Sequence, residues 1–480
     1  MKNRTSNVPI HHSSVLNNTF RYQLGSAIII SILQLITLYF LGRKVSALQL
    51  GIFGTYQMIF RFSFAIFEPG MYSSIIQKLE FNSRLVETLT KYQLLIFGAL
   101  SVFLIGLFYP YWIKMDVETL VLILAIILSG TIAKGSLYHV KLIYANRQFE
   151  VAILITIAHI IEFISLFILL NLTTEIYSFA ISLLIRFLFF YSGTFLLSRK
   201  YVSNINHDEI NIKIHTSYSA HYCLNQGLSY VQGIYDNVLI ALLFGQSIFG
   251  IYILACEMSY FVFSKVNPIF NKAFFPVLSS KVIHKEKTSD AIHSVLLSFL
   301  FITTPIYIFL FSQSESILFW LFPDKYQQMI IIYKYFLIIA FIKSITNILF
   351  TVILSYGKSK EIFYWNISVA IFNYSALVIF YFIKITLEPF MIFMILYALL
   401  VLAFTIYKLN EEEKILELAD LVQYIRYVLY SGLLFLSAYI LKQYKLSLIY
   451  VILIFFGFTV ISVFVVYKEK LINLLKFKIA

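Results

Sequence analysis

Charged side chains occur inside segments that are otherwise apolar, where they could bind a substrate. The candidates for lining a substrate cavity are Arg61, Glu68, Lys134, Arg186, Asp236, Glu257, Lys265 and Lys343. A charge inside a membrane costs about 2.5–3.5 kcal/mol on insertion scales and indicates a function by default. Toward the end of the spans that is predicted to be cytoplasmic, cations outnumber acids. This excess favours an anionic head group, such as a phosphate or pyrophosphate, held by Arg and Lys.

The acidic members of this set are candidates for coupling transport to an ion. Burial beside a changing charge alters the proton affinity of a carboxyl group. We therefore expect Glu68, Asp236 or Glu257 to take up a proton during transport. An ATP-driven mechanism is not expected, because "GKS" at 357–359 lacks the P-loop glycine five residues before its own glycine, where Val352 stands.

The spacing of these residues places them on helix faces. At about 100° per residue, Arg61 and Glu68 lie on one face of a helix, and Glu257 and Lys265 share a sector of another. Arg61 and Glu257 are 196 positions apart, the same offset that separates two similar pentapeptides, "IFGTY" and "IFGIY". We expect the two polar faces to be equivalent in an internal repeat and to meet across its axis.

Structural roles are the alternative for individual members of the set. Lysines near helix ends, such as Lys134, often extend to the membrane interface. Arg61 and Glu68 could pair with buried partners and hold helices together. His159 and Glu162 are three residues apart and could hydrogen-bond each other within one helix.

The elements that position these residues are predicted to be transmembrane helices. The 480-residue chain is 60% hydrophobic and only 13% charged, whereas about 25% charged residues is typical of soluble proteins. Apolar windows of about 20 residues predict an all-α polytopic membrane protein with about fourteen spans: 22–42, 51–76, 92–112, 118–140, 151–171, 175–197, 218–243, 247–273, 291–312, 329–354, 362–383, 388–407, 423–441 and 446–467.

The repeat predicts how these helices are grouped. "IFGTY" at 52–56 begins the second span and "IFGIY" at 248–252 the eighth, and the apolar stretches before them, "LYFLG" and "ALLFG", close at Gly42 and Gly245. We predict two six-helix bundles related by a pseudo-two-fold axis, as in transporters built from parallel repeats. The predicted domains are residues 1–200, residues 218–408, and residues 409–480 with an amphipathic connector and two additional helices.

Charge distribution predicts the topology. Lys and Arg concentrate in alternate loops and at both termini, so the positive-inside rule places the termini in the cytoplasm. The net charge of +13 is explained by these loops, and nucleic acid is not an expected partner. No long loop is predicted on the outer side.

Enzymatic chemistry is not predicted. HExxH, CxxC and G-x-S-x-G constellations are missing from the sequence. Cys223 and Cys256 have no metal-ligand spacing and are expected to pack inside spans. We predict no catalytic residue, no cofactor and no metal site.

Two stretches carry a resemblance to a known family. They are "LGIFGTYQMIFRFSFAIFEPGMYSSIIQ" (50–77) and "DNVLIALLFGQSIFGIYILACEMSYFVFSKVNPIFNKAFFPVLS" (236–279). With the fourteen-helix plan, they resemble the polysaccharide transporter branch of the MOP (multidrug/oligosaccharidyl-lipid/polysaccharide) superfamily, the Wzx-type O-antigen and capsule flippases. Such proteins often have Asp-x-Gly near the end of helix two, where this chain has Glu68-Pro69-Gly70.

The resemblance implies a function, a location and partners. It implies alternating-access flipping of an undecaprenyl-pyrophosphate-linked oligosaccharide from the inner to the outer leaflet of a bacterial plasma membrane. Membrane lipids, a polysaccharide polymerase and a chain-length regulator are the further partners it implies. A MATE-type multidrug or cation antiporter, with an acidic cavity, is the first alternative. A membrane polysaccharide polymerase or ligase is the second. The glycan, the coupling ion and the oligomeric state are left open.

Overall fold

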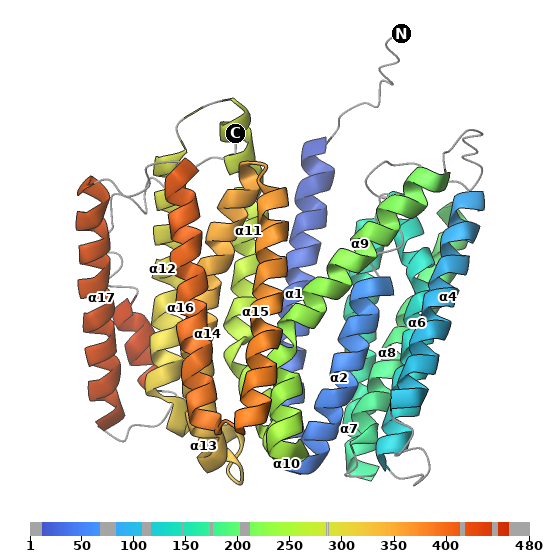
Figure 1. The fold of residues 1–480 in the computed structure, drawn as a ribbon, viewed down its shortest axis with the longest axis horizontal. Helices are drawn as coiled ribbons and strands as arrows, with labels where there is room; N and C mark the ends of the chain where they lie inside the picture. The colour runs from blue at the N-terminus through green and yellow to red at the C-terminus, as the bar shows by residue number, and fades with distance from the viewer. Residues whose placement is uncertain are drawn as a thin grey trace. The chain divides into compact units, whose positions relative to one another are not determined.

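The computed structural model describes residues 12–67, 83–107, 117–145, 147–172, 176–201, 212–284, 286, 288–412, 418–443 and 450–459 (Figure 1). Within these ranges the regular structure is helical, without a strand. The chain divides into two compact units, Met1–Gly250 and Ile251–Ala480. This contact boundary lies inside a helix. The predicted domains 1–200, 218–408 and 409–480 stay a prediction.

The first unit is built from α1 (His12–Lys44), α2 (Ala47–Phe67), α4 (Ser83–Leu107), α6 (Val117–Tyr144), α7 (Gln148–Leu172), α8 (Tyr177–Tyr201), α9 (Ile212–Gly233) and the first part of α10 (Tyr235–Ser259). The second unit contains the end of α10, α11 (Phe261–Ile283), α12 (Ser289–Ser312), α13 (Ser314–Leu321), α14 (Tyr326–Ser355), α15 (Ser359–Ile383), α16 (Leu387–Glu412) and α17 (Leu418–Gln443).

The predicted membrane spans correspond to helices in the described residues. Eleven helical segments there are long and apolar enough to cross a membrane, and two shorter apolar helices, Tyr430–Leu441 and Tyr450–Thr459, fall on the last two predicted spans. Helix α4 begins at Ser83, nine residues before the predicted span at 92, because a helix can continue beyond its apolar part. Residues 68–76 of the second predicted span and 413–417 of the predicted connector lie outside the described residues.

The longest apolar segment, Tyr235–Asn271, is interrupted by a kink. At 37 residues a straight helix would be about 55 Å long, whereas a hydrocarbon core is about 30 Å thick. Gly245 has φ 77° and ψ 172°, which breaks α10 into two parts. The break coincides with the predicted boundary between the spans 218–243 and 247–273. Glycine fits there because it adopts positive φ without a steric penalty.

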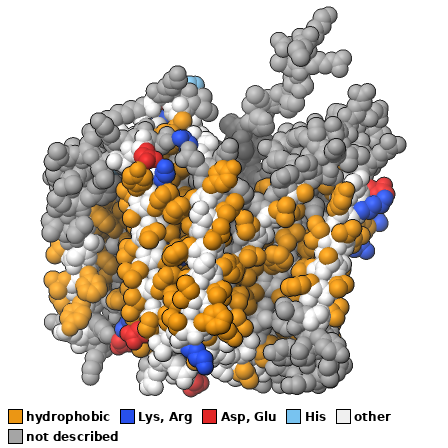
Figure 2. All heavy atoms as spheres, in the orientation of Figure 1, with side chains coloured by type: hydrophobic (Ala, Val, Ile, Leu, Met, Phe, Trp, Pro, Cys, Tyr) orange, Lys and Arg blue, Asp and Glu red, His pale blue; other side chains and the backbone are white. Residues whose placement is uncertain are grey.

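Apolar side chains cover the outside of the helices. Val102, Leu172 and Phe382 expose 72%, 74% and 76% of their surface. Figure 2 shows hydrophobic side chains along the middle of the described helices on the face drawn, with charged side chains near helix ends. Such outward-facing apolar surface is what lipid requires. The chain is therefore a multi-pass membrane protein.

Glycines allow two close helix contacts inside the first unit. A Cβ on Gly51 of α2 would lie 1.9 Å from the Gln246 carbonyl oxygen, and one on Gly250 would lie 2.1 Å from the Ala47 carbonyl oxygen. The second copy of the repeated pentapeptide therefore contacts the start of α2 backbone to backbone. Small residues at membrane helix contacts permit this close approach.

Buried polar side chains connect helices in both units. Gln93 of α4, fully buried, donates to the Phe67 carbonyl at 3.0 Å and to Ser136 Oγ at 2.7 Å. In the second unit, Tyr427 of α17 is hydrogen-bonded to Thr304 of α12 and packs in an apolar cluster with Leu300 and Phe309. These hydrogen bonds give the buried polar groups partners inside the protein, which lipid cannot supply.

Candidate substrate site inside the membrane spans

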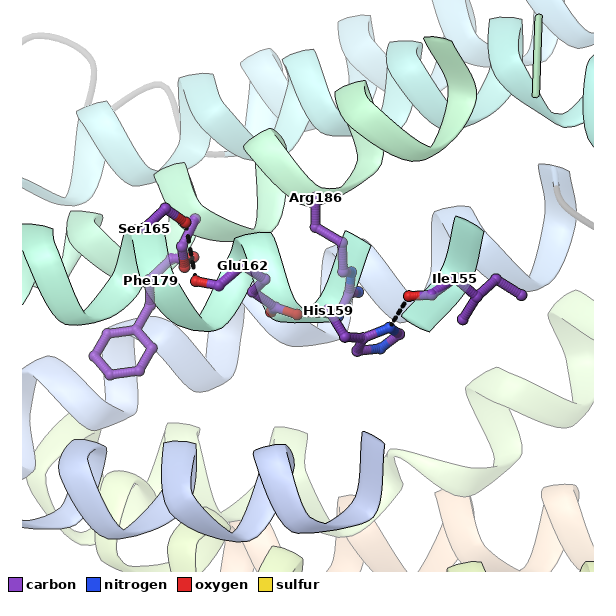
Figure 3. Close-up of polar contacts among 7 residues, drawn as sticks. Ile155, His159, Glu162, Ser165, Phe179 and Arg186 are labelled. Atoms are coloured by element: carbon purple, nitrogen blue, oxygen red, sulfur yellow. Dashed lines mark hydrogen bonds and ion pairs between the residues drawn. The ribbon is translucent and has the colours of Figure 1, made fainter. Parts of the chain in front are cut away.

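The first unit contains an ion pair in the middle of two neighbouring spans. Arg186 Nη1 of α8 donates to Glu162 Oε2 of α7 at 2.7 Å, and the two side chains are 13% and 16% exposed (Figure 3). Both residues lie near the centres of their helices. Pairing reduces the cost of two charges in an apolar setting. Arg186 is one of the predicted cavity residues, and Glu162 is its partner.

Aromatic side chains surround this ion pair. The Arg186 guanidinium lies 4.4 Å from the ring centroid of Phe187, in cation–π geometry. Phe187 in turn packs against Phe60 of α2 at 5.3 Å between centroids. The Tyr56 hydroxyl, fully buried and 3.5 Å from the Ala180 carbonyl oxygen, is within electrostatic reach of both charges. Helix α2 therefore contributes to the surroundings of a pair held by α7 and α8.

His159 hydrogen-bonds within its own helix. Its Nδ1 donates to the Ile155 carbonyl oxygen at 2.8 Å along α7 (Figure 3). The Glu162 carbonyl oxygen accepts from Ser165 Oγ at 2.9 Å, while its carboxylate bonds Arg186. The main partner of Glu162 thus comes from another helix, which spacing within one helix does not reveal.

The other predicted residues of the first unit have varied surroundings. Arg61 of α2 and Lys134 of α6 are exposed. Asp236 is 8% exposed and lies in the first turn of α10, where the helix macrodipole favours an acid. Glu68 lies outside the described residues. In the described part of the chain, the ion pair of Arg186 is the one with Glu162.

The second unit holds the remaining predicted residues. Glu257 near the end of α10 is within electrostatic reach of Lys265, whose Nζ lies 5.5 Å from the Phe261 ring centroid. Lys343 Nζ of α14 lies 5.3 Å from the Tyr260 ring centroid. These cations thus lie beside aromatic rings, as Arg186 does. Arg61 and Glu257 belong to different units, and the meeting of their faces stays a prediction.

Amide side chains near Lys343 form hydrogen bonds between α11 and α14, and Asn267 and Asn271 among them are not residues predicted from the sequence. Asn267 Nδ2 of α11 donates to the Ser344 carbonyl at 2.8 Å and to Asn347 Oδ1 at 3.2 Å. Asn271 Nδ2 donates to the same Oδ1 at 2.8 Å. The Oδ1 atoms of Asn267 and Asn271 are buried and, within the described residues, have no hydrogen-bond donor. The feature of the sequence that could have indicated this set is the spacing of Asn267 and Asn271, which are four residues apart and therefore lie on one face of an apolar helix.

Metal binding finds no candidate group in the described part of the chain. No three His, Cys, Asp or Glu side chains come together there in a way that could hold a metal ion. Cys223 is buried and Cys256 half-buried, and neither forms a disulfide. The described spans offer ion pairing, hydrogen bonding and cation–π contact.

Comparisons with known proteins give a family match and a fold match. The family described as "Polysaccharide biosynthesis protein" matches residues 40–331, more than half of the chain. A solved structure of "Lipid II flippase MurJ, inward closed conformation" is similar with a TM-score of 0.67 and 15% identity, over 94% of this chain and 99% of that chain. At this identity the likeness shows a shared fold. A search of curated proteins finds no match.

Proposed function

Because the chain belongs to the polysaccharide biosynthesis protein family, we propose that it moves a lipid-linked oligosaccharide from one leaflet of a membrane to the other. The observation that carries this proposal is the family match over a chain whose spans contain charged side chains. A protein that only anchored an assembly in the membrane would not need them. The similar solved structure is named as a lipid II flippase, which agrees in kind with a transporter of lipid-linked substrates.

The substrate proposed is an undecaprenyl-pyrophosphate-linked glycan repeat unit. Its pyrophosphate is an oxyanion, and guanidinium and ammonium groups such as Arg186, Lys265 and Lys343 are suited to it. Cations outnumber acids among the predicted cavity residues. A cavity for organic cations would need the opposite balance, which makes the exporter the weaker candidate.

The mechanism proposed is alternating access in a bacterial inner membrane, with both termini in the cytoplasm. The cavity would open first to the inner leaflet, where the repeat unit is completed, and then to the outer leaflet, where a polymerase would use it. Glu68, Asp236 or Glu257 would couple this change to an ion. No covalent chemistry is required of the chain in this scheme.

The test is deletion of the gene in its own bacterium, with complementation by wild type, Arg61→Ala and Glu257→Ala. Surface polysaccharide and lipid-linked intermediates are then measured. We expect surface polysaccharide to be lost and complete single repeat units to accumulate on the inner leaflet. We expect wild type to restore the polysaccharide and the two variants to restore less.

Two outcomes would overturn the proposal. Intact surface glycan with altered drug sensitivity would point to an exporter that shares the fold. Accumulation of single repeat units on the outer leaflet would point to a defect in polymerisation. Protein abundance in the membrane is measured for each variant, so that loss of folding is recognised.

A further inference from the structure

The contact between Arg186 and Glu162 uses only part of the guanidinium. One donor, Nη1, bonds one carboxylate oxygen, Glu162 Oε2, whereas an arginine side chain has five N–H donors in a planar fork. Among the described residues, the contacts that the structure gives Arg186 are this ion pair, the Phe187 ring and the electrostatic influence of Tyr56. The other donors could therefore serve a second oxyanion.

Stability alone is a weak reason for this pair. Apolar side chains of similar volume often stabilise a buried site as well as an ion pair does. A partly exposed pair, with 13% and 16% of the side-chain surfaces open, also lacks the full enclosure that would prevent exchange of partners. The arrangement is better suited to a cation that changes partners.

Phe187 would hold the cation during such an exchange. Its ring lies against the guanidinium at 4.4 Å and is itself fixed by Phe60 and Tyr191, at 5.3 and 5.9 Å between centroids. A cation–π contact does not use the N–H fork that binds oxyanions. Arg186 could thus release Glu162 and keep its place.

We infer that Glu162 is an internal counter-ion, which occupies Arg186 in the empty transporter and yields it to an oxyanion of the substrate. The inference rests on the proposed function and deepens it, since it makes release of the substrate a competition within the chain. Glu162 would displace the bound oxyanion from Arg186 after translocation. The oxyanion is either the phosphate of the lipid carrier or a carboxylate of the glycan.

The competition has a measurable consequence. A site that is closed for nine-tenths of the time binds its ligand about tenfold more weakly than the open site. Removing the charge of Glu162 should therefore increase affinity for the oxyanion by up to about tenfold and slow its release. Removing Arg186 should reduce affinity whether or not Glu162 is present.

The experiment measures equilibrium binding of a fluorescent polyprenyl pyrophosphate to the full-length protein in nanodiscs. The variants are Glu162→Gln, Arg186→Gln and the double variant. Glu162→Asp, which keeps the charge but shortens the reach, serves if Glu162→Gln does not fold. The matched control is Glu315→Gln with Lys334→Gln, which removes a 3.1 Å ion pair on α13 and α14. Thermal unfolding is recorded for each protein.

We expect tighter binding by Glu162→Gln, a smaller gain with Glu162→Asp, weaker binding by Arg186→Gln, and a double variant that resembles Arg186→Gln. The control should bind as wild type does. Equal or weaker binding by Glu162→Gln would overturn the inference. So would a double variant with wild-type binding and transport, because a purely structural pair is rescued by removing both charges.

A second probe distinguishes the source of the oxyanion. A soluble oligouronic acid offers carboxylates without phosphate. If Glu162→Gln binds the lipid probe more tightly than wild type does, Arg186 binds the phosphate of the carrier. If the variant binds the oligouronate more tightly, Arg186 binds the glycan. A gain for neither contradicts the exchange. If wild type itself binds neither probe, the proposed function fails, and this result is distinct from a failure of the variants alone.

Discussion

Replacing Gly250 by alanine should destabilise the first unit through a backbone clash. The added Cβ would lie 2.1 Å from the Ala47 carbonyl oxygen, 2.6 Å from the Gly51 amide nitrogen and 2.9 Å from Leu50 Cβ. Ordinary contact begins at 3.4 Å, so the nearest atom must move by at least 1.3 Å, the difference between 3.4 and 2.1 Å. Two of these atoms belong to the backbone of α2 and cannot rotate away.

Gly250→Ala should reduce the free energy of unfolding by about 3 kcal/mol, near the upper end of the range for overpacking. The assay is reversible unfolding of the purified protein in mixed detergent micelles, with the free energy of unfolding as the readout. Gly51→Ala meets the Gln246 carbonyl oxygen at 1.9 Å and should cost about as much. Since both changes act on one contact, the double variant should cost less than the two single costs together.

The control is Gly98→Ala in α4, where an added Cβ meets nothing within 4 Å. This change should be neutral or stabilising, by up to about 1 kcal/mol, because alanine favours a helix. If Gly250→Ala unfolds like Gly98→Ala, the backbone contact between α2 and α10 does not carry the stability assigned to it here.

Three further predictions use simpler readouts. Gln93→Leu should reduce the free energy of unfolding by about 1–2 kcal/mol, because it removes two buried hydrogen bonds between helices. Ser136→Ala removes one of these bonds and should reduce the free energy of unfolding by less. Equal reductions by the two variants would contradict this account. Glu315→Gln should reduce the free energy of unfolding by at most about 1 kcal/mol, and by less at high salt, because its ion pair with Lys334 is partly exposed. A larger reduction that does not depend on salt would refute this reasoning. The proposed topology places the C-terminus in the cytoplasm, so a fluorescent reporter fused after Ala480 should fold and fluoresce. Alkaline phosphatase fused at the same position should be inactive. The opposite pattern would reverse the proposed topology.

The sequence was informative about the spans because the apolar runs are long. The break at Gly245 also coincides with a predicted boundary, the gap between the spans 218–243 and 247–273. The ends of helices were less predictable, as α4 shows by starting at Ser83. Hydropathy reports where lipid begins, whereas the hydrogen-bonded helix continues into the interface.

The partners of the charged residues could not be predicted in the same way. Glu162 and His159 are neighbours on one helix face, but Glu162 pairs with Arg186, 24 positions away on α8. That pairing depends on how α7 and α8 are rotated against each other, which is set by packing of both helices. The same limit applies to Gln93, because its hydrogen bonds to Phe67 and Ser136 join helices that the sequence alone does not place side by side.

The glycine contact of α2 also has a consequence for biosynthesis. Gly51 leaves the ribosome long before Gln246 and Gly250, and at about 5–20 residues per second the delay is roughly 10–40 s. During this time the start of α2 lacks the segment of α10 that packs against Gly51 in the finished protein. Lipid or the insertion machinery must occupy this surface of α2 until α10 arrives. A fragment ending at residue 200 would keep it uncovered permanently, whereas one extending through Gly250 contains both sides of the contact.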